Sequence, residues 1–230
     1  MRIYLDIESI PGQSNWVREH IAKTVKHPAT HKKPESIERW YAEKAPAAID
    51  EAWRKTALNA TLGEIIVIGW AIDDGLTYSV SRMPEESEFS LLTAFFAQLS
   101  QTTKNAELEN INDQYNKSEP VFAGHNVLFD LGFIWKRSII NNVAMTTRIP
   151  YDEKPWSKAI IDTCQMWKGN SRDSASMSVL CKAFGIDYPD DMDGSKVWDE
   201  VIAGNILKIA AYCEGDVERC RLMYQRMKGI

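Results

Sequence analysis

Ile3-Tyr-Leu-Asp-Ile-Glu8, near the beginning of the chain, is the stretch that decides the fold. Its apolar and polar side chains alternate with a period of two, which predicts a β-strand. The three apolar side chains then lie on one face, and Tyr4, Asp6 and Glu8 project from the other. Pro11 and the glycine after it end the strand. The sequence therefore predicts a strand that carries two neighbouring carboxylates on one face.

A helical insertion is expected between this strand and the next one. One helix is predicted over about residues 14–25, with a serine at its start that can act as the N-cap. Pro34 introduces another helix or a pair of helices. A segment rich in Lys and His, residues 23–33, lies between them. We expect the insertion to occupy about residues 13–60 of a single domain that spans residues 1–230.

The remaining segments alternate between strand and helix patterns. The expected strands are Gly63–Ile72, Leu76–Ser81, Pro120–Ala123 and Ile160–Ile161, with a hairpin turn at Asp73-Asp-Gly75. The expected helices are Phe89–Leu99, Val127–Ile140, Met177–Phe184 and Asn205–Met227. Polar residues 102–118 are expected to form a surface extension or a frayed helix. This order predicts the α/β class, with helices that flank a mixed β-sheet.

Composition restricts the class of protein. The net charge of −5 over 230 residues argues against a general polyanion binder, but not against an enzyme that holds divalent cations on carboxylates. The longest apolar stretch, Ile65–Ile72, is too short to cross a bilayer, and the first residues do not resemble a signal peptide. Cys213 and Cys220 fall on the apolar stripe of a helix, which predicts buried free thiols. We expect a cytoplasmic protein without a membrane partner.

Four carboxylates and one tyrosine are candidate site residues, although each has an ordinary structural explanation. Asp6 and Glu8 can share one divalent cation, but a solvated strand face is the commoner reason for such a pair. Asp130 lies where a strand leads into a helix, a position that favours both α/β active sites and simple capping acids. Tyr212 and Asp216 lie four residues apart on one helix face. Their combination, more than any one of them, predicts a site.

In this order the three motifs resemble those of the DEDD superfamily of 3′–5′ exonucleases. Tyr4–Pro11 resembles the first motif, Ala123–Asp130 the second, and Tyr212–Asp216 the third in its Tyr-x-x-x-Asp form. A sister subgroup has a histidine five positions before the last aspartate, where this chain has Ala211. The chain is similar to the proofreading exonuclease domains of family-B DNA polymerases, here as a free-standing protein. Residues His31–Ile37 resemble the insertion of small phage and prophage members.

The resemblance implies an RNase H-like fold and a 3′–5′ exonuclease that works by a two-metal-ion mechanism. By this resemblance Asp6, Glu8 and Asp216 hold a first ion, and Asp6 bridges to a second ion on which Asp130 acts through water. Mg²⁺ or Mn²⁺ suits a site made only of oxygen ligands. Tyr212 would orient the attacking water, because a tyrosine with a pKa of about 10 is a poor base at neutral pH. The implied partner is nucleic acid with a free 3′ end, with single-stranded DNA favoured.

Further residues allow two interpretations each. His125 and Asn126 are candidates for contacts with the substrate, whereas a hydrogen bond at the helix entry explains His125 equally well. Phe129 either contacts the terminal base or packs in the core, and residues 23–33 either follow the phosphate backbone or form a solvated loop. Asp162 is expected to be a capping residue. Core packing is the expected role, ahead of base stacking, for Trp156, Trp167 and Trp198.

Two alternative functions stay open on the sequence. The same site can trim RNA, since only contacts to the 2′-hydroxyl separate the two substrates. A nucleic-acid-binding module that kept the fold and lost catalysis is the alternative from another class, and the intact acidic positions argue against it. Coincidental matches in an ordinary α/β domain would require all three motifs to be accidental.

Overall fold

The computed structural model describes residues 1–109 and 119–229, without the side chains of residues 107–109. The chain folds into two compact units, one formed by Met1–Glu8 with Ile65–Ile230 and the other by Ser9–Glu64. The first unit contains most of the sheet and the long helices. The second contains the helices between the first two strands. Part of the polar segment 102–118 lies outside the described residues.

Within the described residues, five strands form one mixed sheet, as the sequence predicts. The strands are β1 (Arg2–Ile10), β2 (Glu64–Ile72), β3 (Thr77–Ser81), β4 (Val121–Gly124) and β5 (Ile160–Asp162). Their order across the sheet is β3-β2-β1-β4-β5. β3 is antiparallel to β2, and β4 is parallel to both β1 and β5. The first strand is therefore central, and the carboxyl end of β4 lies beside the middle of β1, where Ala123 pairs with Tyr4.

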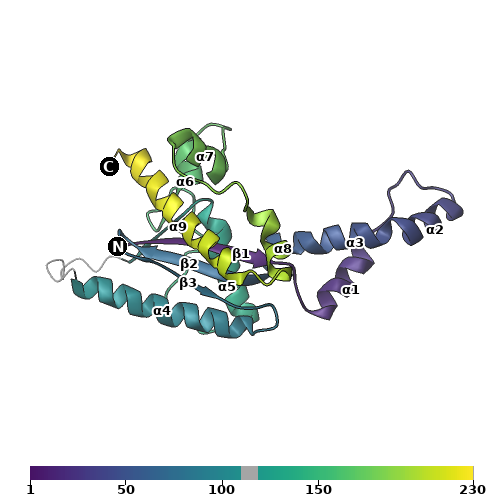
Figure 1. Cartoon of the computed structure of the whole chain (residues 1–230), viewed down its shortest axis with the longest axis horizontal. Coiled ribbons are helices and arrows are strands. Elements are labelled where there is room, and N and C mark those ends of the chain that lie inside the picture. Colours follow the sequence, from purple (N-terminus) through teal and green to yellow (C-terminus); the bar gives the residue numbers. More distant parts are fainter. Residues whose placement is uncertain (110–118, 230) are drawn as a thin grey trace. The chain divides into compact units, whose positions relative to one another are not determined.

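One face of the sheet is covered by the last helix, α9 (Ile206–Lys228) (Figure 1). Tyr4 of β1 packs with Val217 and Tyr224 of this helix in one buried cluster. Gly69 allows the close approach, because a Cβ atom at this position would lie 3.0 Å from the Cys213 sulphur. The face of β1 that carries Tyr4 also carries Asp6 and Glu8, since they follow at intervals of two. The first strand therefore directs its carboxylates toward α9.

The opposite face carries α4 (Glu88–Glu109) and α5 (Val127–Ile140). Trp70 of β2 meets Phe95 of α4 in an edge-to-face contact with ring centroids 5.4 Å apart. A buried ion pair joins the two helices, since Arg137 Nε donates to both carboxylate oxygens of Glu88 at 3.0 Å. Glu88 also accepts the Ile65 backbone N–H at 2.7 Å, so it links both helices to the sheet.

Short helices follow β5 in the carboxyl-terminal third of the chain. Two of them match no expected element: α6 (Thr163–Lys168) and α8 (Val197–Ile202), which follows a 3-10 turn, η3 (Gly194–Lys196). The third, α7 (Met177–Phe184), has the predicted bounds and packs on α9 through Leu180 and Met223. Cys181, Cys213 and Cys220 are buried free thiols and Cys164 is partly exposed. No helix in the described ranges has the length and apolarity needed to cross a membrane.

The second unit is helical, as expected for the segment between the first two strands. It contains α1 (Asn15–Thr24), α2 (Pro34–Glu43), α3 (Ala45–Arg54) and the 3-10 turn η1 (Lys55–Leu58). Trp53 organises this unit: its indole N–H donates to the Gly12 carbonyl at 2.8 Å. The Arg18 guanidinium lies over the same ring, 3.6 Å from its centroid. The sequence left open one helix or a pair of helices after Pro34, and the structure has the pair.

Candidate active site

Three carboxylates from opposite parts of the sequence meet between β1 and α9. Asp6, Glu8 and Asp216 each offer one oxygen, and these oxygens all lie within 4.8 Å of one another. Glu8 and Asp216 are only 7% and 6% exposed. Asp6 and Glu8 reach this point because they share one face of a strand, and Asp216 because it lies on the side of α9 that covers the sheet.

Asp130 approaches the cluster from the strand-to-helix junction between β4 and α5. Gly124 ends β4 where a Cβ atom would lie 3.0 Å from the Leu5 carbonyl oxygen and even closer to Val127. Asn126 then adopts the left-handed conformation with φ 63°, and its N–H donates to the Asp162 carboxylate at 2.9 Å. The tight turn begins α5, so that Asp130 lies in the first helical turn, 5% exposed.

Burial and mutual repulsion raise the pKa values of these acids. Burial is the largest cause for Asp6, and the charges of Asp130, Glu8 and Asp216 add to it, so its pKa lies well above the usual range. Glu8 shows the same behaviour, again through burial first and the neighbouring charges second. For Asp130, burial also dominates, against hydrogen bonds from the backbone of Asp130 and Ile7 that lower the pKa. The protein alone therefore does not stabilise this much negative charge.

The oxygen atoms of the cluster fit a divalent cation. Asp6 Oδ2 is buried, and no hydrogen-bond partner for it lies in residues 1–109 or 119–229. A buried, unpartnered carboxylate oxygen costs free energy unless another group compensates it. Carboxylate oxygens are the ligands that Mg²⁺ and Mn²⁺ prefer, and an ion placed among them would both neutralise the repulsion and partner Oδ2.

Two residues that were not predicted complete the surroundings of Asp216. Arg219 Nη1 donates to Asp216 Oδ1 at 2.8 Å, which holds the pKa of Asp216 below the level that its burial would otherwise produce. Tyr188, from the segment between α7 and α8, places its hydroxyl 2.8 Å from the Tyr212 hydroxyl. The Arg219 guanidinium lies over the Tyr188 ring, 5.0 Å from the centroid. Tyr188 and Arg219 thus hold Tyr212 and Asp216 in place.

Tyr212 stays protonated in this environment. Burial is the main cause that raises its pKa far above the usual value, and the negative charge of Asp216 adds to the shift. Its hydroxyl is therefore a hydrogen-bonding group and not a base at neutral pH. This agrees with a role in orientation.

A comparison with protein families decides the identity of the chain. Residues 58–230, three quarters of the sequence, match the family described as predicted 3′–5′ exonucleases related to the exonuclease domain of PolB. The chain belongs to this exonuclease family. A search of curated proteins gives no significant match. The family match begins after β1, so it does not cover Asp6 and Glu8, which are brought next to Asp216 by the fold.

The second-motif residues of the exonuclease are held by the fold. Both ring nitrogens of His125 have partners: Nδ1 lies 3.0 Å from the Thr163 hydroxyl and Nε2 lies 3.1 Å from the Ala175 carbonyl. Burial lowers the pKa of His125, so the ring is neutral at physiological pH. In this conformation His125 connects β4 to the segments around α6 and α7, and not to the entry of α5. Any contact of this ring with substrate would need one of these bonds to be exchanged.

Other candidate residues of the exonuclease differ in exposure. Phe129 is about one third exposed beside Phe133, with ring centroids 5.6 Å apart. The expectation of core packing is wrong for Trp156, which is 81% exposed, and Trp167 is also exposed. Trp156 lies in a connecting segment and Trp167 on the short helix α6, and too few apolar neighbours are available there to cover an indole. Asp162 is confirmed as a capping residue, because it accepts the Cys164 and Gln165 N–H groups of α6.

Proposed function

We propose that this exonuclease removes nucleotides from the 3′ end of single-stranded DNA by metal-dependent hydrolysis, in one RNase H-like domain of the tyrosine-containing DEDD subgroup. The family match supports the reaction class. The single observation that carries the mechanism is the meeting of Asp6, Glu8 and Asp216 with their oxygens within 4.8 Å. A cation site explains why buried acids with raised pKa values gather on the carboxyl side of a central strand.

The roles of the acids follow from their positions. Asp6, Glu8 and Asp216 hold the first cation, and Asp6 also faces Asp130, whose charge raises its pKa. Asp130 would help to hold a second cation. When bound, the two divalent ions would supply an activated water, neutralise the phosphoryl oxygens and support the leaving 3′-oxygen. Mg²⁺ and Mn²⁺ are the ions that suit these ligands.

Tyr212 orients the attacking water with its hydroxyl, which remains protonated. The Tyr188 hydroxyl, 2.8 Å away, fixes the direction in which the Tyr212 hydroxyl points. Arg219 pairs with Asp216 in the metal-free protein, and its guanidinium would be available to a phosphate if a cation were bound to Asp216 instead. Hydrolysis breaks the bond between phosphorus and the 3′-oxygen. It leaves a shorter strand with a free 3′-hydroxyl and releases a nucleoside 5′-monophosphate.

Digestion of end-labelled oligonucleotides tests the proposal. Single-stranded DNA and RNA of one sequence, labelled at the 5′ or the 3′ end, are incubated with Mg²⁺, with Mn²⁺ or with EDTA. We expect a ladder that shortens from the 3′ end, mononucleotide as the product, a preference for DNA, and no reaction in EDTA. Faster digestion of RNA than of DNA would show that RNA is the preferred substrate. Cleavage from the 5′ end or within the strand would overturn the proposed 3′–5′ exonuclease reaction.

A matched pair of variants excludes a contaminating nuclease. Asp216→Asn removes a metal ligand while it keeps the size of the side chain, and Asp173→Asn makes the same change on an exposed loop. We expect the first variant to lose activity by at least about 100-fold and the second to keep it. Equal activity in both would show that the acid cluster is not the site of hydrolysis. Isothermal titration with Mn²⁺ on the same two proteins separates loss of metal binding from loss of folding.

A further inference from the structure

The charge of the chain is distributed unevenly between its two units. Residues 9–64 contain nine Lys and Arg against seven Asp and Glu, a net charge of +2, whereas the rest of the chain has eighteen against twenty-five, a net charge of −7. Three of the four histidines also lie in the helical unit. A strand of nucleic acid carries one negative charge per phosphate and is repelled by an acidic surface. The helical unit is therefore the part of the molecule whose charge suits the strand.

Six of the nine basic residues of the helical unit have no ion-pair partner in the described part of the chain. Arg18 lies over the Trp53 ring, and Arg54 and Lys55 form ion pairs with Asp50 and Glu51 one helical turn away. The other six are exposed and form no ion pair within the described part of the chain; they are Lys23, Lys26, Lys32, Lys33, Arg39 and Lys44. Unpaired Lys and Arg side chains can neutralise phosphates without first losing an internal partner.

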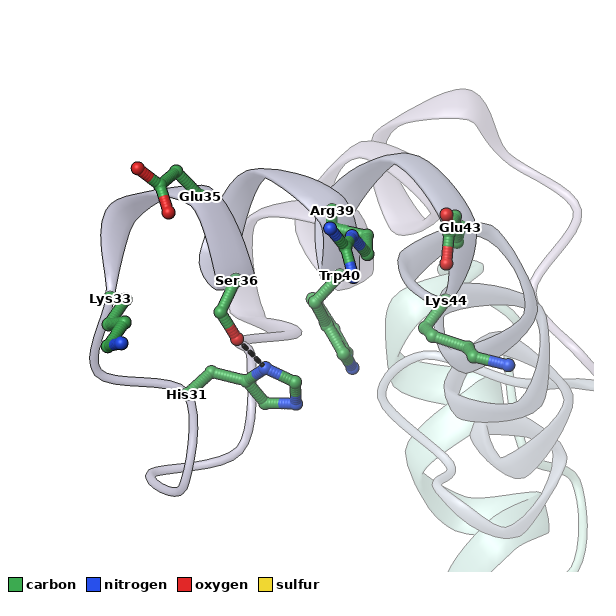
Figure 2. A pocket seen from close by; sticks show the side chains of 8 residues that line it. All are labelled: His31, Lys33, Glu35, Ser36, Arg39, Trp40, Glu43 and Lys44. Carbon is green, nitrogen blue, oxygen red and sulfur yellow. Dashed lines mark hydrogen bonds between the residues drawn. The ribbon is translucent and has the colours of Figure 1, made fainter.

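A cavity of about 470 Å³ gathers three of these six side chains (Figure 2). It is formed by α2 and by the loop before this helix, and its lining includes Lys33, Arg39 and Lys44 together with the aromatic rings of His31 and Trp40. In Figure 2 the imidazole and the indole face the same space, with Lys33 and Lys44 toward its two ends. This volume is within the range of pockets that bind small ligands, and it suits one nucleotide.

The polar groups of the cavity match the parts of a nucleotide. The three cations exceed the two acids of the lining, Glu35 and Glu43, by one charge, which suits a single phosphate. Carboxylates can in turn accept the amino groups of bases. His31 Nδ1 pairs with the Ser36 hydroxyl at 2.6 Å, and no described residue partners the second ring nitrogen. The ring is thus held in place with one polar atom available to a ligand.

Aromatic side chains continue from the cavity over the surface of the same unit. Tyr41 is 46% exposed next to Trp40, with the two rings at 84° and their centroids 5.1 Å apart. The His27 ring lies 6.0 Å from Tyr41, and Trp16 on α1 is 54% exposed. Exposed aromatic rings among unpaired cations are the usual features of surfaces that bind single strands, because the rings stack on bases while the cations follow the backbone.

We propose that the helical unit is a second nucleic-acid-binding site of the exonuclease, in which the α2 cavity holds one nucleotide of a single strand at a position other than the cleaved bond. The phosphate contacts Lys33, Arg39 and Lys44, and the base lies against His31, with the largely buried Trp40 in the wall of the cavity. The inference rests on the proposed function for its choice of ligand. It adds an anchoring site that does not depend on the carboxylates or on metal.

Binding measurements in EDTA test the anchoring site without hydrolysis. Fluorescence anisotropy follows a labelled 20-nucleotide single-stranded DNA with the full chain, the double variant Lys33→Ala/Arg39→Ala and the double variant Arg54→Ala/Lys55→Ala. Both variants remove two positive charges from the same unit, but only the first changes the cavity. We expect Lys33→Ala/Arg39→Ala to weaken binding about tenfold and to lower the number of counterions released on binding by about one. The dissociation constant of Arg54→Ala/Lys55→Ala should stay within about threefold of that of the unchanged chain. Equal weakening in both, or none in the first, would overturn the proposal.

Hydrolysis of a small substrate separates this proposal from the proposed function. The p-nitrophenyl ester of thymidine 5′-monophosphate contains a phosphodiester but no strand that could reach an anchor. With Mn²⁺ we expect the Lys33→Ala/Arg39→Ala variant to hydrolyse this ester at the unchanged rate and to show a raised KM, with the same kcat, on the 20-nucleotide DNA. A normal KM on DNA would overturn the anchor and leave the nuclease intact. If the cavity binds the strand but neither substrate is hydrolysed, the proposed nuclease function would be rejected and the proposed anchoring site would stand.

Discussion

Asp6 Oδ2 illustrates the conflict between stability and function at the level of one atom. The oxygen is buried and has no hydrogen-bond partner among the described residues, and its carboxyl group has a pKa well above the usual range because of burial and three neighbouring acids. A side chain that served only the fold would not be kept in this state, because an amide or an apolar group would cost less. A buried carboxylate oxygen without a partner is what a cation site presents before the cation binds.

Replacement of this acid should therefore stabilise the metal-free protein while it abolishes activity. Asp6→Asn removes one charge from the cluster, so we expect the free energy of unfolding in EDTA to rise by on the order of 1–2 kcal/mol. Urea unfolding measures this change, and Asp173→Asn on an exposed loop is the control. A less stable Asp6→Asn protein would show that the acids do not repel one another in the folded state. Activity should fall at least about 100-fold.

Tyr212 should contribute less to the rate than the acids do. Its hydroxyl stays protonated, so in the proposed mechanism it orients water and does not remove the proton. We expect Tyr212→Phe to lower kcat about 10- to 100-fold, and Asp6→Ala or Asp216→Ala to lower it further. Tyr188→Phe, which removes the partner hydroxyl at 2.8 Å, should have a smaller effect than Tyr212→Phe. Single-turnover rates on a short oligonucleotide make the comparison, and equal, complete loss in the tyrosine and aspartate variants would contradict this division of roles.

The sequence could identify the acids but not the residues that hold them. Asp6, Glu8, Asp130, Tyr212 and Asp216 occur in local motifs that can be read from spacing. Tyr188 and Arg219 act through contacts made only in the folded chain, and a single tyrosine in a loop or an arginine three residues after an aspartate has no pattern of its own. Their positions required the structure.

At the scale of secondary structure, length decided which elements could be predicted. The helix α5 has the expected bounds, and α9 begins and ends within one residue of them, because several turns repeat an apolar stripe. Each of α6 and α8 has six residues, less than two turns, so neither shows a period that can be recognised. The capping role of Asp162 was visible, but the helix that it caps was not. The helix α4 extends ten residues beyond the expected end, since its polar continuation lacks an apolar stripe.

The link between α4, α5 and β2 through Glu88 gives a prediction at this scale. Glu88 is 6% exposed and accepts hydrogen bonds from Arg137, from Asn141 and from the Ile65 backbone. Glu88→Ala removes the carboxylate that pairs with the buried Arg137 guanidinium, so we expect a loss of about 3–5 kcal/mol in the free energy of unfolding.

Chemical denaturation of the Glu88→Ala protein measures this loss, and Glu51→Ala is the control. Glu51 forms an ion pair with Lys55 as well, but both side chains are exposed, so its removal should leave the denaturation midpoint unchanged. Equal effects of the two variants would show that the buried pair contributes no more than a surface pair.

At the scale of the whole molecule, the buried acids should make stability depend on pH in an unusual direction. The folded-state pKa values of Asp6, Glu8 and Asp130 are raised above their ordinary values of 3.8, 4.5 and 3.8. The folded protein therefore binds more protons than the unfolded chain does. The contribution of these three acids to the free energy of unfolding is fully present below about pH 4. It is lost as the pH rises through their raised pKa values.

Thermal unfolding in EDTA between pH 5 and pH 8 tests this dependence. We expect the midpoint to fall more steeply with pH than in Asp6→Asn/Asp130→Asn, which keeps all surface acids. Mn²⁺ should raise the midpoint again. At a concentration one hundred times its dissociation constant, it should add about 2.7 kcal/mol to the free energy of unfolding. The effect should be stronger at pH 8, because fewer protons compete with the ion for the carboxylates. Parallel pH curves for the two proteins would contradict the raised pKa values.

The distance along the chain between Asp6 and Asp216 has a consequence during synthesis. One acid lies on β1 and the other on α9, and the proposed cation site needs both. A polypeptide still being translated lacks the second until β5 and the helices after it have left the ribosome. If the proposed site is correct, incomplete chains, including those released by premature termination before α9, would thus be inert toward the messenger RNA and other strands around them.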